Sequence, residues 1–194
     1  MKNKILMAMS GGIDSSVAAI ELRRQGYELK GVTFTQLTLD SPAVSEARQM
    51  ASDMGFEHHT LDMRREFHDS VICNFINEYL HGRTPNPCVQ CNSNIKWGML
   101  QKFADEMGCF YIATGHYARI EKHPKTGRYA VRNSATAVKD QTYALYRLTQ
   151  EQLQLPSVLD QTAQTVHWEE TAQADVQQLI DLAFYPSYGQ VKST

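Results

Sequence analysis

Short apolar segments alternate with segments of helical periodicity from Lys4 to Ala113, and this alternation is the strongest constraint on the fold. The segments expected to be strands are Lys4–Met9, Leu29–Phe34, Glu57–Leu61 and Phe110–Ala113. The helices expected between them are Ser15–Gln25, a helix that begins at Ser41-Pro42 and ends before Gly55, Glu66–Tyr79 and Asn94–Met107. Strands that alternate with helices predict an α/β fold with a doubly wound, mostly parallel sheet of the Rossmann-like kind. In such folds ligands bind outside the carboxyl ends of the strands.

Composition excludes several classes of protein. Of the 194 residues, 42% are hydrophobic and 21% are charged, which is typical of a globular protein that can bury a core. No apolar run approaches the roughly 20 residues of a membrane span, and Ile5–Met9 is too short for the core of a signal peptide. We therefore expect a cytoplasmic protein with no membrane contact.

Charge is distributed unevenly along the chain, although the net charge is only −2. Between Arg119 and Arg147 there are seven basic residues and two acidic ones, which predicts a local basic patch. From Leu148 to Thr194 there are six acidic residues and one basic residue. We expect a domain over residues 1–153 and a divergent, acidic, Gln-rich tail over 154–194. The tail has one helical stripe, formed by Ala172, Val176, Leu179, Ile180 and Ala183.

The junction between the first strand and the first helix is the strongest functional motif. It reads Ser10-Gly11-Gly12-Ile13-Asp14-Ser15-Ser16. Glycines let the backbone approach a ligand closely, and the N–H groups at a helix start attract an anion, to which serine hydroxyls can also donate. The lysine of a Walker A loop is absent. An ordinary glycine turn with a Ser or Asp cap is the alternative, but the strand–loop–helix context favours a phosphate-binding loop.

The chain has four cysteines, and in the cytosol such a count indicates chemistry or metal binding rather than disulfides. Cys88 and Cys91 form a Cys-x-x-Cys pair just before the helix expected from Asn94. The dipole of that helix would favour the thiolate of Cys91. Half a zinc site, a redox dithiol and an iron–sulfur site remain alternatives for the pair. Cys73 and Cys109 are expected in the core.

Apolar residues at helical spacing predict which faces of the helices are buried. The helix expected over Glu66–Tyr79 should bury one stripe. That stripe consists of Phe67, Val71, Phe75 and Tyr79.

Four blocks of sequence resemble the tRNA-specific 2-thiouridylases of the ATP pyrophosphatase loop superfamily. They are Ser10–Ser16, Thr84-Pro85-Asn86-Pro87-Cys88-Val89-Gln90-Cys91-Asn92-Ser93-Asn94-Ile95-Lys96-Trp97, Ala113–Arg119 and Lys139–Leu153, in the family's order. The resemblance spans residues 4 to 153. It implies an ATP-dependent tRNA uridine 2-sulfurtransferase, which adenylates the C2 oxygen of the wobble uridine and then displaces AMP with sulfur.

The resemblance also implies roles for individual residues. Residues that would bind ATP are Ala8, Met9, Ser10, Gly11, Gly12, Ile13, Asp14 and Ser15, with Phe34 beside the adenine and Gly115 lining the pocket. Cys91 matches the nucleophile, and Cys88 would be its partner. Residues that would contact tRNA are Asn86, Pro87 and Cys88 at the target base, and Lys139, Asp140 and Gln141 elsewhere.

The implied cofactors are ATP and Mg²⁺. Cys at position 88 is typical of a subgroup in which the Cys-x-x-Cys pair can hold an iron–sulfur cluster; no other metal is expected. The implied partners are tRNA and a sulfur-relay protein or cysteine desulfurase. A second copy of the chain or a full-length paralogue is a further candidate partner.

The chain departs from the family pattern in two respects. No cysteine follows Cys109, whereas family members present persulfide sulfur on a second cysteine beyond the Lys-Asp-Gln block. The family also continues into a linker domain and a C-terminal β-barrel. The alternative is therefore a nucleotide-binding subunit or inactive paralogue without complete sulfur-transfer chemistry. A third reading, a different ATP pyrophosphatase such as an amide-forming synthetase, predicts that Cys91 is dispensable.

Overall fold

The computed structural model describes residues 3–39, 41–134 and 139–154. Four parallel strands form its main sheet in the order β3–β2–β1–β4. Their bounds are Lys4–Ala8 for β1, Glu28–Thr35 for β2, His58–Asp62 for β3 and Tyr111–Thr114 for β4. Each predicted strand is present to within one residue at either end, so the expected parallel α/β fold is confirmed.

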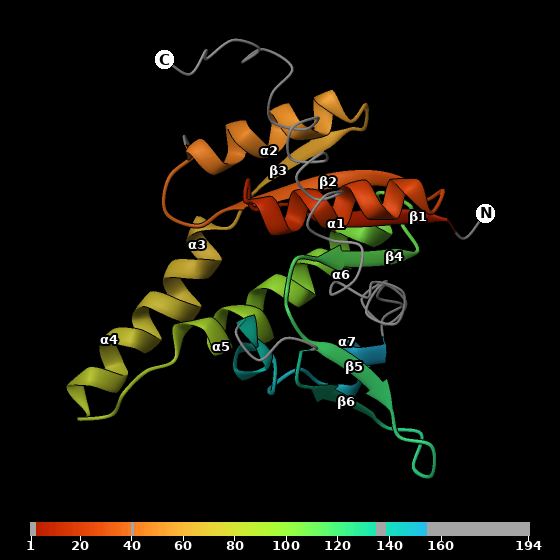
Figure 1. Cartoon of the computed structure of the whole chain (residues 1–194). Helices are drawn as coiled ribbons and strands as arrows, with labels where there is room; N and C mark the ends of the chain where they lie inside the picture. The colour runs from red at the N-terminus through yellow and green to blue at the C-terminus, as the bar shows by residue number, and fades with distance from the viewer. Residues whose placement is uncertain (1–2, 40, 135–138, 155–194) are drawn as a thin grey trace, which may run out of the picture.

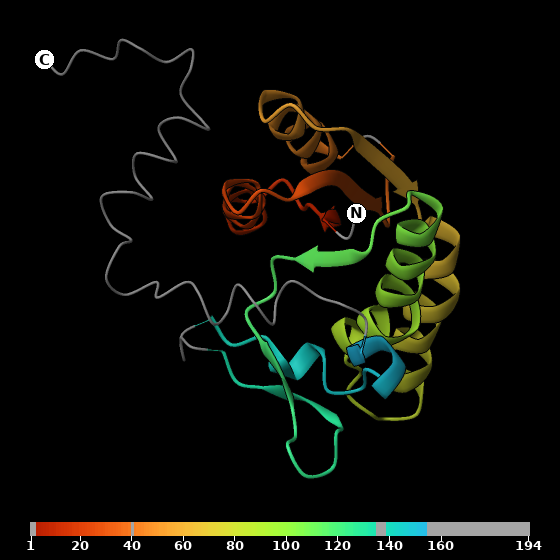
Figure 2. The ribbon, with the colours of Figure 1, turned by 90° about the vertical axis from the view of Figure 1, so that its right-hand side faces the viewer.

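Helices cover both faces of the sheet, as Figures 1 and 2 show. On one face lie α1 (Ile13–Arg24) and α2 (Pro42–Asp53), which pack against Ile5 and Met7 of β1. On the other face α6 (Trp97–Glu106) packs against Leu6. Because side chains alternate across a strand, β1 supplies both cores, and the sheet is doubly wound as predicted.

The segment predicted as one helix over Glu66–Tyr79 is helical throughout but buries less than expected. It consists of α3 (Arg64–Phe67), the π-helical turn η1 (His68–Ile72) and α4 (Cys73–Leu80). Val71 is buried and Phe67 partly buried, whereas Phe75 and Tyr79 are 40% and 57% exposed and Cys73 is also exposed. The predicted burial of Phe75, Tyr79 and Cys73 is therefore wrong. The reason is that α4 runs away from the sheet, where the described residues do not cover it (Figure 1).

The helix expected to start at Asn94 starts at Pro87. It runs through α5 (Pro87–Cys91), the π-helical turn η2 (Asn92–Lys96) and α6. Asn86 caps it by accepting a hydrogen bond from the Val89 N–H (3.2 Å). Proline is favoured in the first turn of a helix, because its missing N–H is not needed there. The helix therefore begins at Pro87, directly after the irregular residues 81–86.

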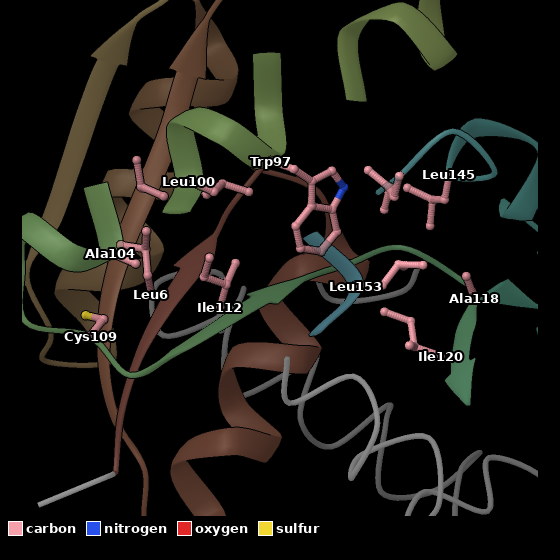
Figure 3. Packing of buried hydrophobic residues seen from close by; sticks show 12 residues of the cluster. Leu6, Trp97, Leu100, Ala104, Cys109, Ile112, Ala118, Ile120, Leu145 and Leu153 are labelled. Atoms are coloured by element: carbon pink, nitrogen blue, oxygen red, sulfur yellow. The ribbon is translucent and has the colours of Figure 1, made fainter. Parts of the chain in front are cut away.

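A small second sheet follows β4 and was not predicted. Strands β5 (Arg119–Lys122) and β6 (Tyr129–Arg132) pair antiparallel, and η4 (Thr142–Ala144) and α7 (Gln150–Gln154) complete this region. Its apolar residues share the core of α6, and Figure 3 shows Trp97 lying between the sheet and the residues of this region. The buried apolar residues that this region adds to the core are Ala118, Ile120, Leu145, Leu148 and Leu153.

The sheet and the described residues of 118–134 and 139–153 are therefore held by a common core. The tail expected over 154–194, with its stripe from Ala172 to Ala183, lies outside the described residues beyond Gln154. Among the helices described, none is both long and apolar enough to span a bilayer.

Candidate functional site

The predicted phosphate loop connects the end of β1 to the start of α1. Gly11 has a φ of +75°, which only glycine adopts without strain. A Cβ at this position would lie 2.8 Å from the Ala43 carbonyl oxygen and 3.0 Å from Glu46 Oε2. The start of α2 therefore packs directly on the loop, and any side chain at position 11 would push the two apart.

Serine side chains hold the loop in shape. Ser15 Oγ and Ser16 Oγ both donate to the Gly12 carbonyl oxygen, at 3.0 and 3.1 Å, and the Ser10 N–H donates to Ser15 Oγ at 3.3 Å. The N-cap of α1 is Gly12, and no side chain of the described residues caps this helix. The first N–H groups of a helix lack partners within the helix, so this end of α1 suits the oxygens of a phosphate.

Neighbouring strands anchor the base of the loop. The Met9 N–H donates to the Val32 carbonyl oxygen (2.8 Å), and Thr33 Oγ1 donates to the Met9 carbonyl oxygen (3.0 Å). The same hydroxyl lies 2.9 Å from His58 Nε2. Burial, with Arg48 and His59 nearby, lowers the pKa of His58 to about 4. The imidazole is thus neutral at pH 7, and β1, β2 and β3 together fix the loop.

Two further residues predicted to bind ATP lie at the same carboxyl edge of the sheet. Phe34 is near the end of β2 and partly buried against two core clusters. Gly115 directly follows β4, and a Cβ there would lie 3.2 Å from Ser15 N and 3.3 Å from Ser15 Cα. The predicted ATP-binding residues therefore gather at one edge, although ATP contact itself stays a prediction.

A cluster of three polar side chains lies at the start of α1. The Tyr117 hydroxyl donates to Asp14 Oδ1 (2.5 Å), and Lys139 Nζ lies 3.4 Å from the same oxygen and 5.1 Å from the Tyr117 ring centre. Burial and the bond to Asp14 raise the pKa of Tyr117, and proximity to Tyr117 and Asp14 raises the pKa of Lys139. Lys139 is therefore a cation beside the phosphate loop.

The two residues after Lys139 form hydrogen bonds within the chain. Asp140 accepts from the Ser134 N–H and the Thr142 N–H, both at 2.9 Å, and from the Thr142 hydroxyl. These bonds lower the pKa of Asp140. Gln141 pairs with the Tyr117 backbone twice: its Oε1 accepts from the Tyr117 N–H and its N–H donates to the Tyr117 carbonyl oxygen, each at 2.9 Å. Contact of this segment with tRNA stays a prediction.

The buried thiol of Cys91 faces the same edge of the sheet. Cys91 is only 7% exposed and packs among Met63, Val71 and Ile95. Gln36, the residue after β2, donates from Nε2 to Cys91 Sγ at 3.4 Å. Burial raises the pKa of this thiol, and Lys96 opposes part of that effect.

The prediction that a helix dipole favours the Cys91 thiolate is therefore wrong. Cys91 does not precede a helix start, because it is the last residue of α5. The cysteine in the first turn of this helix is Cys88, which is exposed. Cys109 is buried as predicted. The structure thus separates the Cys-x-x-Cys pair into one exposed thiol and one buried thiol.

Some residues near the site had no assigned role in the sequence. Gln36 stands in no motif, and only the fold brings it to Cys91. Lys96 lies in the block Thr84–Trp97, which resembles the 2-thiouridylases. It is close enough to Cys91 and His116 to affect the pKa of both. Burial and Lys96 lower the pKa of His116 to about 4, and its Nδ1 lies 2.9 Å from Thr114 Oγ1.

Metal donors are sparse in the described part of the chain. No group of three or more His, Cys, Asp or Glu side chains there could hold a metal ion. An iron–sulfur cluster takes four ligands, and Cys88 and Cys91 supply two at most. The described residues alone do not fit such a cluster.

Comparison with known proteins identifies the family. A family model described as "tRNA methyl transferase HUP domain" matches residues 3–174. The chain belongs to this HUP domain family. Curated relatives of this HUP domain are named tRNA-specific 2-thiouridylase MnmA. Proteins from Clostridioides difficile and Amoebophilus asiaticus are both 48% identical, over 165 and 167 residues. A third, MnmA 2 from Thermoanaerobacter sp. (strain X514), is 44% identical over 167 residues.

The HUP domain covers only part of these relatives. The alignments take in 79%, 78% and 79% of this chain but 46%, 43% and 46% of the respective relatives. The resemblance to tRNA-specific 2-thiouridylases is confirmed, and the chain spans about half the length of the relatives that it matches.

Proposed function

We propose that this HUP domain carries the catalytic site of an ATP-dependent tRNA uridine 2-sulfurtransferase. One observation carries the proposal: a phosphate-type loop and the Cys91 thiol lie at the same edge of the sheet, in a chain 48% identical to proteins named 2-thiouridylase. An amide-forming synthetase would need the loop but not the thiol. Sulfur insertion needs both.

The loop would perform the activation half of the reaction. Its backbone N–H groups would hold the phosphates while the C2 oxygen of the uridine attacks the α-phosphorus and pyrophosphate leaves. This step converts a poor leaving group on C2 into AMP. Asp14 and Glu46 place carboxylates at the loop, which are ligands that Mg²⁺ prefers. Mg²⁺ would offset the charge of the phosphates.

Cys91 would perform the sulfur half. A cysteine desulfurase or sulfur-relay protein would first transfer sulfur to Cys91 as a persulfide, whose terminal sulfur attacks C2 while AMP leaves with the former uridine oxygen. The Cys88 thiolate then attacks Cys91 Sγ, and the bond between Sγ and the transferred sulfur breaks. This leaves 2-thiouridine and a Cys88–Cys91 disulfide, which an external thiol reduces.

The tRNA would lie along the basic stretch from Arg119 to Arg147. Arg132 pairs with Glu121 (3.1 Å) across the β5–β6 hairpin, while Lys125 is exposed. Phosphate contacts of such residues make binding depend on salt. We assign the protein to the cytoplasm, as a partner of tRNA and of a sulfur donor, alone or with a second copy of itself.

A second candidate is a nucleotide-binding subunit without complete chemistry. The burial of Cys91, which is only 7% exposed, favours it. Such a subunit would bind ATP through the same loop. It would not need the Cys91 thiol.

The test is tRNA thiolation by the purified chain with ATP, Mg²⁺, an unmodified tRNA transcript and a persulfide donor. We expect 2-thiouridine from the wild-type chain and from Cys109→Ser, and none from Cys91→Ser. The second candidate replaces the first if the chain binds ATP but makes no 2-thiouridine through Cys91. This result would have to hold both for the wild-type chain alone and for its mixture with a full-length relative.

A further inference from the structure

The phosphate loop contains no basic residue of its own. From Ala8 to Ser16 the chain has neither Lys nor Arg, and the lysine that completes a Walker A loop is absent. Phosphate sites for nucleoside triphosphates usually include such a cation, because backbone N–H groups offset only part of the charge. The fold supplies one from a distant segment, since Lys139 Nζ lies at Asp14 in the first turn of α1.

We propose that Lys139 binds the β- and γ-phosphates of the nucleotide rather than tRNA. The inference rests on the proposed function to the extent that ATP must bind at Ser10–Ser16. It assigns Lys139 to the pyrophosphate leaving group, where its charge is most useful when the bond to the α-phosphorus breaks.

The neighbours of Lys139 fix its position. Asp140 takes three hydrogen bonds from Ser134 and Thr142, and Gln141 pairs twice with the Tyr117 backbone. Asp140 therefore ties the segment to Ser134 and Thr142, and Gln141 ties it to the Tyr117 backbone. Lys139 alone of the three directs its charged group to the phosphate loop.

The contacts of Lys139 are suited to exchange. Lys139 and Asp14 are 58% and 49% exposed in their side chains, and exposed ion pairs are weak. The Tyr117 hydroxyl also donates to Asp14, so that carboxylate keeps a partner when Lys139 leaves it. An arriving triphosphate, with several negative charges, can thus recruit Lys139 without leaving Asp14 unpaired.

Calorimetric titration of the full chain with ATP and with AMP tests the proposal. We expect Lys139→Gln to weaken ATP binding by about tenfold or more, the usual effect of a lost charge-assisted hydrogen bond, and to change AMP binding less than about twofold. Lys139→Arg should restore most of the ATP affinity. Lys102→Gln, an exposed lysine on α6, is the matched control and should bind both nucleotides as wild type does.

Three results would overturn the assignment. ATP affinity that is unchanged in Lys139→Gln excludes a phosphate contact, and a simultaneous loss of tRNA affinity would give Lys139 to the tRNA. Equal losses for ATP and AMP would indicate damage to the loop. A wild-type chain that binds neither nucleotide would instead defeat the proposed function, and this inference with it.

Discussion

Gln36 Nε2 lies 3.4 Å from Cys91 Sγ, so the buried thiol of the Cys-x-x-Cys pair is attached to the end of β2. Phe34, two residues earlier, belongs to the same strand and packs against the cluster that contains Cys91. The strand next to the phosphate loop therefore also determines where the thiol lies. Cys91 is packed among mostly apolar side chains, so any sulfur that it carries would have to move out from between them to reach a substrate.

Alkylation should follow the burial of the cysteines. At about pH 7.5 we expect iodoacetamide to modify the exposed Cys73 and Cys88 before the buried Cys91 and Cys109. Burial raises the pKa of both buried thiols, so their rates should continue to rise with pH where ordinary thiols level off. Mass mapping of peptides over a time course measures the order. The chain unfolded in urea is the control, and Cys91 reacting first in the folded chain would contradict the geometry.

Replacement of Gly11 should weaken nucleotide binding. In Gly11→Val the side chain meets the Ala43 carbonyl oxygen at 2.8 Å and takes an unfavourable φ. We expect ATP affinity to fall by more than about tenfold, since the left-handed conformation alone costs about 1–2 kcal/mol. Gly127→Val has a similar φ of +67° but lies in the β5–β6 turn. This control should lose stability and keep its ATP affinity; equal affinities in the two variants would count against the loop.

Acid should destabilise the chain through His116. Its pKa is about 4 in the folded chain against an ordinary value of 6.5, because it is buried and near Lys96. Between these values the unfolded chain binds a proton that the folded chain does not, so the free energy of unfolding falls as pH falls. The full effect is about 3 kcal/mol. Urea unfolding at about pH 7 and about pH 4.5 should show a smaller loss in His116→Gln than in wild type. The exposed His68→Gln is the control; identical losses in wild type and His116→Gln would contradict the prediction.

Removal of Trp97 should separate the sheet from the region that follows it. Trp97 is 1% exposed and lies between Leu100 of α6 and Leu145 in the common core (Figure 3). We expect Trp97→Ala to lower the free energy of unfolding by about 3–5 kcal/mol. Leu80→Ala, at a residue 77% exposed, should cost less than about 0.5 kcal/mol. Circular dichroism during denaturation measures both; similar values for the two variants would contradict a common core.

The sequence predicts best what depends on neighbouring residues. The four strands and the loop at Ser10–Ser16 could be placed because apolar runs and glycines are local signals. The helix start at Pro87 was missed because two prolines resemble a break, although Asn86 and Pro87 together make a favourable cap. Burial of Phe75 and Tyr79 could not be judged, because it depends on where α4 points relative to the sheet.

Local sequence patterns cannot predict contacts between residues that are far apart in the sequence. Asp14 and Tyr117 are separated by 103 residues, and Gln36 and Cys91 by 55. No periodicity or spacing links such pairs, so the charged cluster at Lys139 and the partner of the thiol emerge only from the fold. The hairpin of β5 and β6 does have a local signal in the sequence, since Ile120 and Val131 alternate with charged or small neighbours.

The most direct measurement is the amount of AMP and of 2-thiouridine formed in one reaction of the chain with ATP, tRNA and a persulfide donor. We expect wild type to form one AMP for each 2-thiouridine. We also expect that Cys91→Ser forms no 2-thiouridine and that no AMP forms without tRNA. Formation of 2-thiouridine by Cys91→Ser at the wild-type rate, or AMP that accumulates without tRNA, would contradict it.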